Sequence, residues 1–234
     1  MCGIFGLVSQ SKVDRRDLKT LVLHARQRGR DSSGLIYIDH STYKVERADY
    51  DVIKLLGKVK PYHSSIVFGH SRLITNGLGD NQPVVRNGIC VIHNGIIVND
   101  EEIWQKITPK RQLKIDSEVI AAITEQHLEE GAALSALPNR IFSLCKGVIA
   151  CAITIPKIGK AIVFSNNGSL YVGKKGESTY FSSESYPLQR VGCEDINQIK
   201  QEGYIVDIPQ SDQVIVADES TRKEDLIPEF KYIK

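Results

Sequence analysis

The chain has 234 residues, which fits one large domain or two small ones, and 41% of its residues are hydrophobic. Its 30 basic and 28 acidic side chains give a formal net charge of +2, so no strong field for polyanions is expected and nucleic acid binding is disfavoured. No run approaches the roughly 18 apolar residues that a membrane-spanning helix needs, and the N-terminal apolar stretch ends at Val8, which disfavours a membrane protein and a signal peptide.

Short strand-like runs recur along the whole sequence. Apolar segments rich in β-branched residues predict strands at 3–9, 35–39, 42–47, 66–71, 89–93, 148–155, 161–165, 170–172, 179–182, 203–207 and 213–216. Helical periodicity predicts helices at 15–28, 101–107, 117–130 and 132–144, the last of them split by Pro138. Because no linker divides the chain, we expect one domain over 1–234, of the α+β class with two stacked sheets flanked by helices, and a charged tail at 222–234.

The cysteine and histidine patterns exclude two kinds of site. Five cysteines at irregular spacing suit a reducing, cytoplasmic setting better than a disulfide framework, and Cys90, Cys145 and Cys151 are expected to be small core residues. The six histidines show no ligand spacing, and the sequence has no HExxH or CxxC motif. We therefore expect neither a metal ion nor a cofactor.

The chain begins Met-Cys-Gly-Ile, which places a thiol directly after the initiator methionine. If Met1 is removed, Cys2 carries both a nucleophilic sulfur and a free α-amine. A thiol with a pKa of about 8.5 is only a few per cent thiolate near neutral pH, whereas an amine with a pKa of about 7.7–8.0 is roughly one-tenth free base. The amine can therefore serve as general base for the thiol, through a bridging water. Taken alone, the terminus favours a plain structural residue at the start of a strand.

Four further segments combine polar residues with glycine or with a helix start. They are RGRDSSG at 28–34, GHSRLITNG at 69–77, HNG at 93–95 and DSEV at 116–119. Each has a structural explanation when taken alone: Asp116 is a good helix N-cap, and His70 and His93 are expected to be satisfied core histidines without a chemical role.

Together with Cys2, these ordered segments resemble the class II glutamine amidotransferases, whose glutaminase domains are N-terminal nucleophile hydrolases. The resemblance runs from Cys2 to about Asp207 and implies a four-layer αββα fold, with Cys2 at the start of a strand that faces a glutamine pocket. Leu73 and Asn76 stand where the glucosamine-6-phosphate synthase branch has tryptophan and histidine, so the ammonia gating of that branch does not carry over. Other features are closer to the asparagine synthetase branch, and the subfamily stays open.

The resemblance also implies roles for individual residues. Cys2 is the nucleophile, Arg28 braces the terminal loop and orients the amine, and the Asn94 side-chain amide and the Gly95 N–H form an oxyanion hole. The residues implied in substrate binding are Arg72 for the α-carboxylate, Asp116 for the α-ammonium, and Leu73, Thr75 and Asn76 around them.

These roles imply hydrolysis of the side-chain amide of L-glutamine through a γ-glutamyl thioester on Cys2, which yields glutamate and ammonia. We expect a glutaminase subunit that supplies ammonia to a separate synthase subunit. Two alternatives stay open, namely a stand-alone amidohydrolase of glutamine or γ-glutamyl compounds, and a non-catalytic module that senses glutamine. The terminal thiol argues against the second alternative, because a pure binder does not need it.

Overall fold

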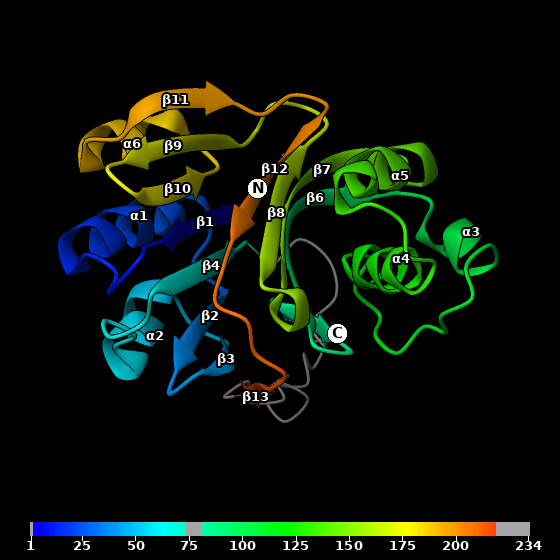
Figure 1. The fold of residues 1–234 in the computed structure, drawn as a ribbon, viewed down its shortest axis with the longest axis horizontal. Coiled ribbons are helices and arrows are strands. Elements are labelled where there is room, and N and C mark those ends of the chain that lie inside the picture. Colours follow the sequence, from blue (N-terminus) through cyan, green and yellow to red (C-terminus); the bar gives the residue numbers. More distant parts are fainter. Residues whose placement is uncertain (1, 74–80, 219–234) are drawn as a thin grey trace, which may run out of the picture.

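Two β-sheets stack face to face in the computed structural model, which describes residues 2–73 and 81–218 (Figure 1). The larger sheet has eight strands, in the order β11 (Glu194–Gln198), β9 (Tyr171–Lys175), β10 (Ser178–Ser182), β1 (Gly3–Val8), β4 (Ile66–Arg72), β2 (Ser32–Asp39), β3 (Thr42–Ala48) and β13 (Val214–Asp218). The smaller sheet has five, in the order β12 (Glu202–Asp207), β8 (Lys160–Ser165), β7 (Gly147–Ile155), β6 (Ile89–Ile97) and β5 (Val84–Arg86).

Helices cover the outer face of each sheet (Figure 1). The larger sheet carries α1 (Arg15–Arg28), α2 (Val52–Val59) and α6 (Ser185–Val191). The smaller sheet carries α3 (Asp100–Trp104), α4 (Glu118–Glu129) and α5 (Leu137–Leu144), with two short 3₁₀ segments at Leu134–Ala136 and Pro156–Ile158. Three hydrophobic clusters fill the three interfaces between these layers, which confirms the expected αββα arrangement.

Strand alternation decides which side chains enter the space between the sheets. In β1, Ile4 belongs to the inter-sheet cluster and Phe5 to the cluster under α1. In β6, Ile92 belongs to the inter-sheet cluster and Val91 to the cluster under α4. Because successive side chains of a strand point to opposite faces, the even-numbered residues of β1, β4, β6 and β7 face the inter-sheet space.

The predicted helices agree with the structure except near their ends. The helix at 15–28 is confirmed, and its N-cap Asp14 accepts hydrogen bonds from the backbone N–H groups of Arg16 and Asp17. The helix predicted at 101–107 ends at Trp104 instead. The 132–144 segment divides as expected, because Pro138 lies in the first turn of α5, where a missing N–H costs nothing.

Among the described residues, the sequence did not predict the helices α2 and α6, the strands β5 and β11, or the 3₁₀ segment at Pro156–Ile158. In addition, β2 begins at Ser32, three residues earlier than expected, so the end of the RGRDSSG segment is strand. Its Ser-Ser-Gly start has low strand propensity, and it is strand because it pairs with residues 70–72 of β4.

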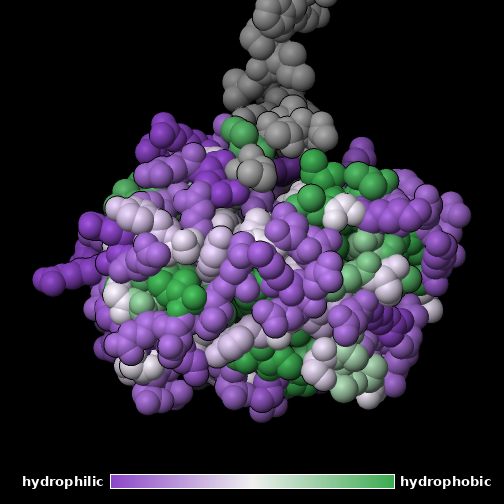
Figure 2. Space-filling view, turned by 90° about the horizontal axis from the view of Figure 1, so that it is seen from above, coloured by the Kyte–Doolittle hydropathy of each residue, from purple (hydrophilic) through white to green (hydrophobic). Residues whose placement is uncertain are grey.

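The described surface shows mainly polar character on the face in Figure 2, where hydrophobic side chains form separate patches. No helix of the described residues is long and apolar enough to cross a membrane. The tail predicted at 222–234 lies outside the described residues.

Candidate active site

The start of β1 is fixed by contacts from two other segments. The carbonyl oxygen of the half-buried Cys2 accepts a hydrogen bond from Arg28 Nε at 2.9 Å, and Arg28 Nη1 pairs with Glu184 at 2.7 Å. The Ile4 N–H donates to Ser183 Oγ at 3.0 Å, and the Ser183 N–H donates to the Ile4 carbonyl oxygen at 2.9 Å. Arg28 thus contacts Cys2 through the carbonyl group, and its effect on the amine stays a prediction.

The segment that follows α1 packs tightly on the end of β4. A Cβ atom on Gly29 would lie 2.3 Å from the carbonyl carbon of Arg72, so only glycine fits there. Ser71 Oγ donates to the Gly29 carbonyl oxygen at 2.7 Å, and the Asp31 N–H donates to the Arg72 carbonyl oxygen at 3.0 Å. These contacts bring the segments that carry Arg28 and Arg72 together.

Strand alternation places Cys2, Arg72 and Asn94 at one end of the inter-sheet space. Each lies on the same face as the residue two positions further into its strand. Ile4 and Ile92 belong to the inter-sheet cluster, and His70 lies close to His93 of β6. Beyond them, the cross-strand pair Ile96 and Val148 is 55% and 42% exposed, so the apolar packing ends there. A thiol, a cation and a buried amide therefore lie where the sandwich opens.

Glycine at position 95 is required by the neighbouring strand. A Cβ atom there would lie 1.8 Å from the Val148 carbonyl oxygen and 2.7 Å from His93 Nε2. The need for glycine therefore comes from the close approach of β7. Asn94 is only 3% exposed beside it, so its amide is held in a largely dry environment.

Asp116 does not cap the following helix, so its interpretation as an N-cap is wrong. The helix begins at Glu118, and its N-cap position is occupied by Ser117, which forms no side-chain cap bond. Asp116 Oδ2 instead accepts the Ile97 N–H at 2.9 Å, and Oδ1 lies 3.2 Å from Ser117 Oγ. The carboxylate is thereby fixed at the end of β6, the strand that carries Asn94.

Gln82, to which the sequence assigned no role, holds the backbone beside Asn94. Its Nε2 donates to the His93 carbonyl oxygen at 3.0 Å, and its Oε1 accepts the His93 N–H at 2.6 Å. Nε2 also lies 3.2 Å from Ser117 Oγ. On its other side, the Gln82 carbonyl oxygen packs so closely on Gly34 that a Cβ there would lie 2.1 Å away. Gln82 therefore couples the two sheets at the candidate site.

The two histidines differ in how they are satisfied. His93 Nε2 contacts the Val148 carbonyl oxygen at 3.2 Å and Nδ1 contacts Ser117 Oγ at 3.1 Å, as expected for a satisfied core residue. His70 is fully buried, and neither ring nitrogen meets the geometric limits of a hydrogen bond to a described residue, so its satisfaction stays a prediction. Burial lowers the pKa of both rings, and with the nearby Arg72 charge it lowers the pKa of His70 to about 3.

We expect His70 to make the protein less stable in acid. Between about pH 6.5 and pH 3 the unfolded chain protonates this histidine and the folded chain does not, so the free energy of unfolding falls by up to about 1.4 kcal/mol per pH unit as pH falls. Urea unfolding at several pH values should give a steeper loss for the wild type than for His70→Asn. Equal slopes would contradict a depressed His70 pKa, because all other titrating groups are shared.

Of the remaining residues predicted to bind substrate, the structure describes only Leu73. Leu73 directly follows β4, and its side chain is 43% exposed. Thr75 and Asn76 lie outside the described residues, so their roles stay predictions.

Other groups in the described part of the chain offer poor alternatives to Cys2. Burial raises the pKa of Cys90, Cys145 and Cys193 to about 12, and raises that of Cys151 as well, so all four are held as thiols. A mainly apolar groove of about 370 Å³ lies between α1 and α2, but its described lining contains no cysteine, serine or threonine. Within residues 2–73 and 81–218, no three His, Cys, Asp or Glu side chains are grouped to hold a metal ion.

Comparison with known families supports the resemblance seen in the sequence. The profile described as "Glutamine amidotransferase domain" matches residues 70–190, more than half of the chain. The chain belongs to this glutamine amidotransferase domain family, and the predicted resemblance to class II enzymes is confirmed. The matched range includes Arg72, Asn94, Gly95 and Asp116, whereas Cys2 lies outside it.

Two curated relatives and one solved structure illustrate the similarity. The amidophosphoribosyltransferase of Pasteurella multocida (strain Pm70) is 29% identical over 228 residues, which cover 86% of this chain and 45% of that protein. A glutamine–fructose-6-phosphate aminotransferase (isomerizing) of Rhizobium meliloti is 27% identical over 196 residues, covering 80% and 32%. The chain thus spans less than half the length of these relatives.

The solved structure is that of glutamine phosphoribosylpyrophosphate amidotransferase from B. subtilis in complex with ADP and GMP. It superposes with a TM-score of 0.66 at 21% identity, over 88% of this chain and 49% of that one. This similarity confirms the fold.

Proposed function

We propose that this domain hydrolyses the side-chain amide of L-glutamine with Cys2 as nucleophile. The observation that carries the proposal is the placement of Cys2, Arg72 and Asn94 at the open end of the inter-sheet space. Free glutamine is a zwitterion, so a selective site needs a cation and an anion. Arg72 supplies the cation, and Asp116, fixed on the Ile97 N–H, supplies the anion.

The reaction takes place in two steps. The Cys2 thiol gives its proton to the Cys2 α-amine, which is free once Met1 is removed, and the resulting thiolate attacks the amide carbon. The carbonyl electron pair moves onto oxygen, where the Asn94 amide and the Gly95 N–H stabilise it. The carbon–nitrogen bond then breaks, the proton on the amine passes to the leaving nitrogen, and ammonia is released. The γ-glutamyl thioester stays on the sulfur.

Water completes the cycle in the second step. The amine takes a proton from the attacking water, the carbon–sulfur bond breaks, and the sulfur recovers a proton as glutamate leaves. The same amine thus acts as base and acid in turn, which requires a pKa near the working pH.

Transfer of the ammonia to a separate synthase subunit is part of this proposal. Both curated relatives are named for group transfer, and this chain covers less than half of each. A cytoplasmic setting fits, because all five cysteines are free thiols. Glutaminase activity should be low for the chain alone and should rise when an ammonia-accepting subunit is added; unchanged turnover would contradict partner dependence.

The nucleophile can be tested by intact-mass spectrometry with 6-diazo-5-oxo-norleucine, an alkylating glutamine analogue. We expect the mass of the chain without Met1 and, after treatment, the addition of a single label on Cys2. The Cys193→Ala variant should label in the same way, because that half-buried thiol has a raised pKa. Active protein that retains Met1, or a label that persists in Cys2→Ala, would contradict the mechanism.

A further inference from the structure

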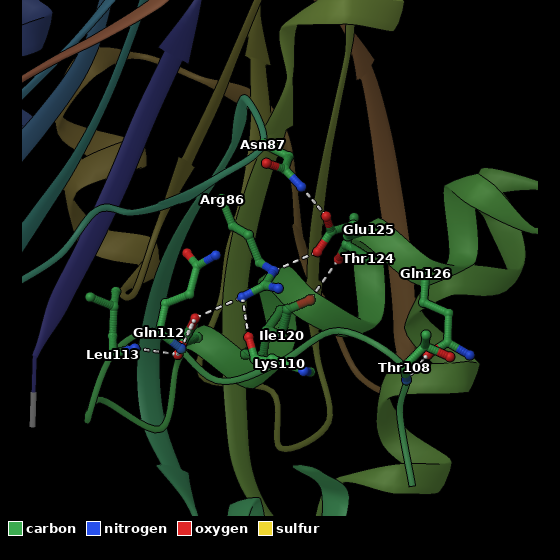
Figure 3. Close-up of polar contacts among 11 residues, drawn as sticks. Arg86, Asn87, Thr108, Lys110, Gln112, Leu113, Ile120, Thr124, Glu125 and Gln126 are labelled. Carbon is green, nitrogen blue, oxygen red and sulfur yellow. Dashed lines mark hydrogen bonds and ion pairs between the residues drawn. The ribbon is translucent and has the colours of Figure 1, made fainter. Parts of the chain in front are cut away.

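A buried ionic network joins β5 to α4 on the outer side of the smaller sheet (Figure 3). Arg86, at the end of β5, is 6% exposed and pairs with both Glu118 and Glu125 of α4. Its Nη1 lies 2.9 Å from Glu118 Oε1, and Asn87, the next residue of the chain, donates to Glu125. Glu118 is only 1% exposed, so its charge is stabilised almost entirely by the protein.

The same network also holds the backbone of the loop before α4. Glu118 accepts the Gln112 N–H at 3.0 Å and the Leu113 N–H at 2.7 Å. Arg86 Nη1 donates to the Lys110 carbonyl oxygen at 2.9 Å (Figure 3). Three backbone groups of this loop, at residues 110, 112 and 113, therefore form hydrogen bonds to two buried charged side chains.

Asp116 lies inside the short segment that Glu118 closes. It follows Leu113 by three residues and precedes Glu118 by two, so both ends of its segment are fixed by one carboxylate. Within that segment its own carboxylate reaches the Ile97 N–H at 2.9 Å. If the turn opened, Asp116 would lose this fixed position at the end of β6.

We propose that Glu118, held by Arg86, is a positioning residue that places Asp116 for the ammonium group of the substrate. The role of Asp116 rests on the function proposed above, whereas the link between Glu118 and the Asp116–Ile97 contact does not. Stability alone is a poor explanation of the network, because buried ion pairs often contribute little net stability. The two carboxylates moreover differ in what they hold: Glu118 bonds the loop, and Glu125 bonds Arg86 and Asn87.

This difference provides a matched pair of variants, Glu118→Gln and Glu125→Gln. Each variant replaces one of the two carboxylates paired with Arg86 by an uncharged amide. Only Glu118→Gln also weakens the hydrogen bonds to the loop backbone. We expect Glu118→Gln to raise KM for glutamine about tenfold, because Asp116 is no longer held in place for the ammonium group, and to keep kcat within about threefold of the wild type. The tenfold change corresponds to about 1.4 kcal/mol of binding free energy. Both variants should lower Tm by a similar amount, but Glu125→Gln should leave KM within about twofold of the wild type.

Amide hydrogen exchange at Ile97 gives a second measurement that does not depend on activity. We expect faster exchange of the Ile97 N–H in Glu118→Gln and in Asp116→Ala, and wild-type exchange in Glu125→Gln. If the wild type proved unable to turn over glutamine, the proposed function would fail, and Ile97 exchange would still decide whether Glu118 positions Asp116.

A conservative variant covers the case in which Glu118→Gln does not fold. Glu118→Asp keeps the charge next to Arg86 but is too short to reach the Gln112 and Leu113 N–H groups. It should raise KM and speed Ile97 exchange in the same way. The proposal is overturned if Glu118→Asp behaves as wild type in both measurements, or if Glu118 and Glu125 variants shift KM equally.

Discussion

Replacing Cys2 with alanine is expected to reduce glutamate release by roughly 10⁴-fold or more, the scale seen when a catalytic nucleophile is removed. The thioester cannot form without the sulfur, and the other four cysteines are held as thiols by their raised pKa values. Alanine is small enough for Met1 still to be removed. Glutamine binding, measured by calorimetry, should change by less than about threefold because Arg72 and Asp116 are untouched.

Two controls separate loss of the nucleophile from loss of structure. Cys193→Ala removes another half-buried thiol at the end of α6 and should keep full activity. The Cys2→Ala protein should show wild-type Tm, since the contact that fixes this residue involves its carbonyl oxygen and not its side chain. Turnover that persists in Cys2→Ala would exclude the mechanism proposed here.

The fold class could be predicted from sequence because it depends on features that are local in the chain. The α1 helix has an aspartate N-cap and a clear apolar stripe, and the central strands are continuous apolar runs. The missed elements are short: α2 has eight residues with a glycine inside, and β5 has three. Such elements are stable mainly through packing against neighbours, which no local pattern reports.

In the candidate site too, the residues in local motifs could be predicted from the sequence, and the residues that support them through distant contacts could not. Cys2 was named because it follows the initiator methionine, and Arg72, Asn94 and Asp116 because they lie in short polar segments beside glycine or a helix start. Two supporting residues were missed. Gln82 bonds the backbone of His93, eleven positions along the chain, and Glu184 pairs with Arg28, 156 positions away. Contacts of this kind depend on the register between strands and loops, which the sequence pattern does not specify.

Asp116 shows how a correct local rule can fail. An aspartate just before a helix predicts an N-cap, yet Glu118 folds back on the loop and holds the turn, and Asp116 bonds to the end of β6 instead. Glu118, the third residue of the DSEV segment, is the residue from which this arrangement could have been predicted. A buried glutamate in the first turn of a helix needs a buried partner, and Arg86 is that partner.

Replacing Asn94 with alanine is expected to lower kcat by about 10²–10³ and to leave KM within about threefold. Its side-chain amide would donate to an oxyanion that exists only in the transition state and in the tetrahedral intermediate, so ground-state binding should not depend on it. Asn94 is 3% exposed on the strand that also carries Gly95, and the low polarity there strengthens such a hydrogen bond. Asn94→Asp should be slower still, because its negative charge repels the oxyanion.

The matched control for this prediction is Asn99→Ala. Asn99 is also buried, just beyond β6, but its amide donates to the Leu144 carbonyl oxygen at 3.0 Å and accepts the Lys146 N–H at 2.7 Å, so its role is to hold the end of α5. Asn99→Ala should lower Tm and keep kcat near the wild-type value. Steady-state kinetics and thermal unfolding of both variants decide the assignment. If Asn94→Ala keeps its kcat, or loses kcat only to the extent that it loses folded protein, Asn94 does not stabilise the transition state.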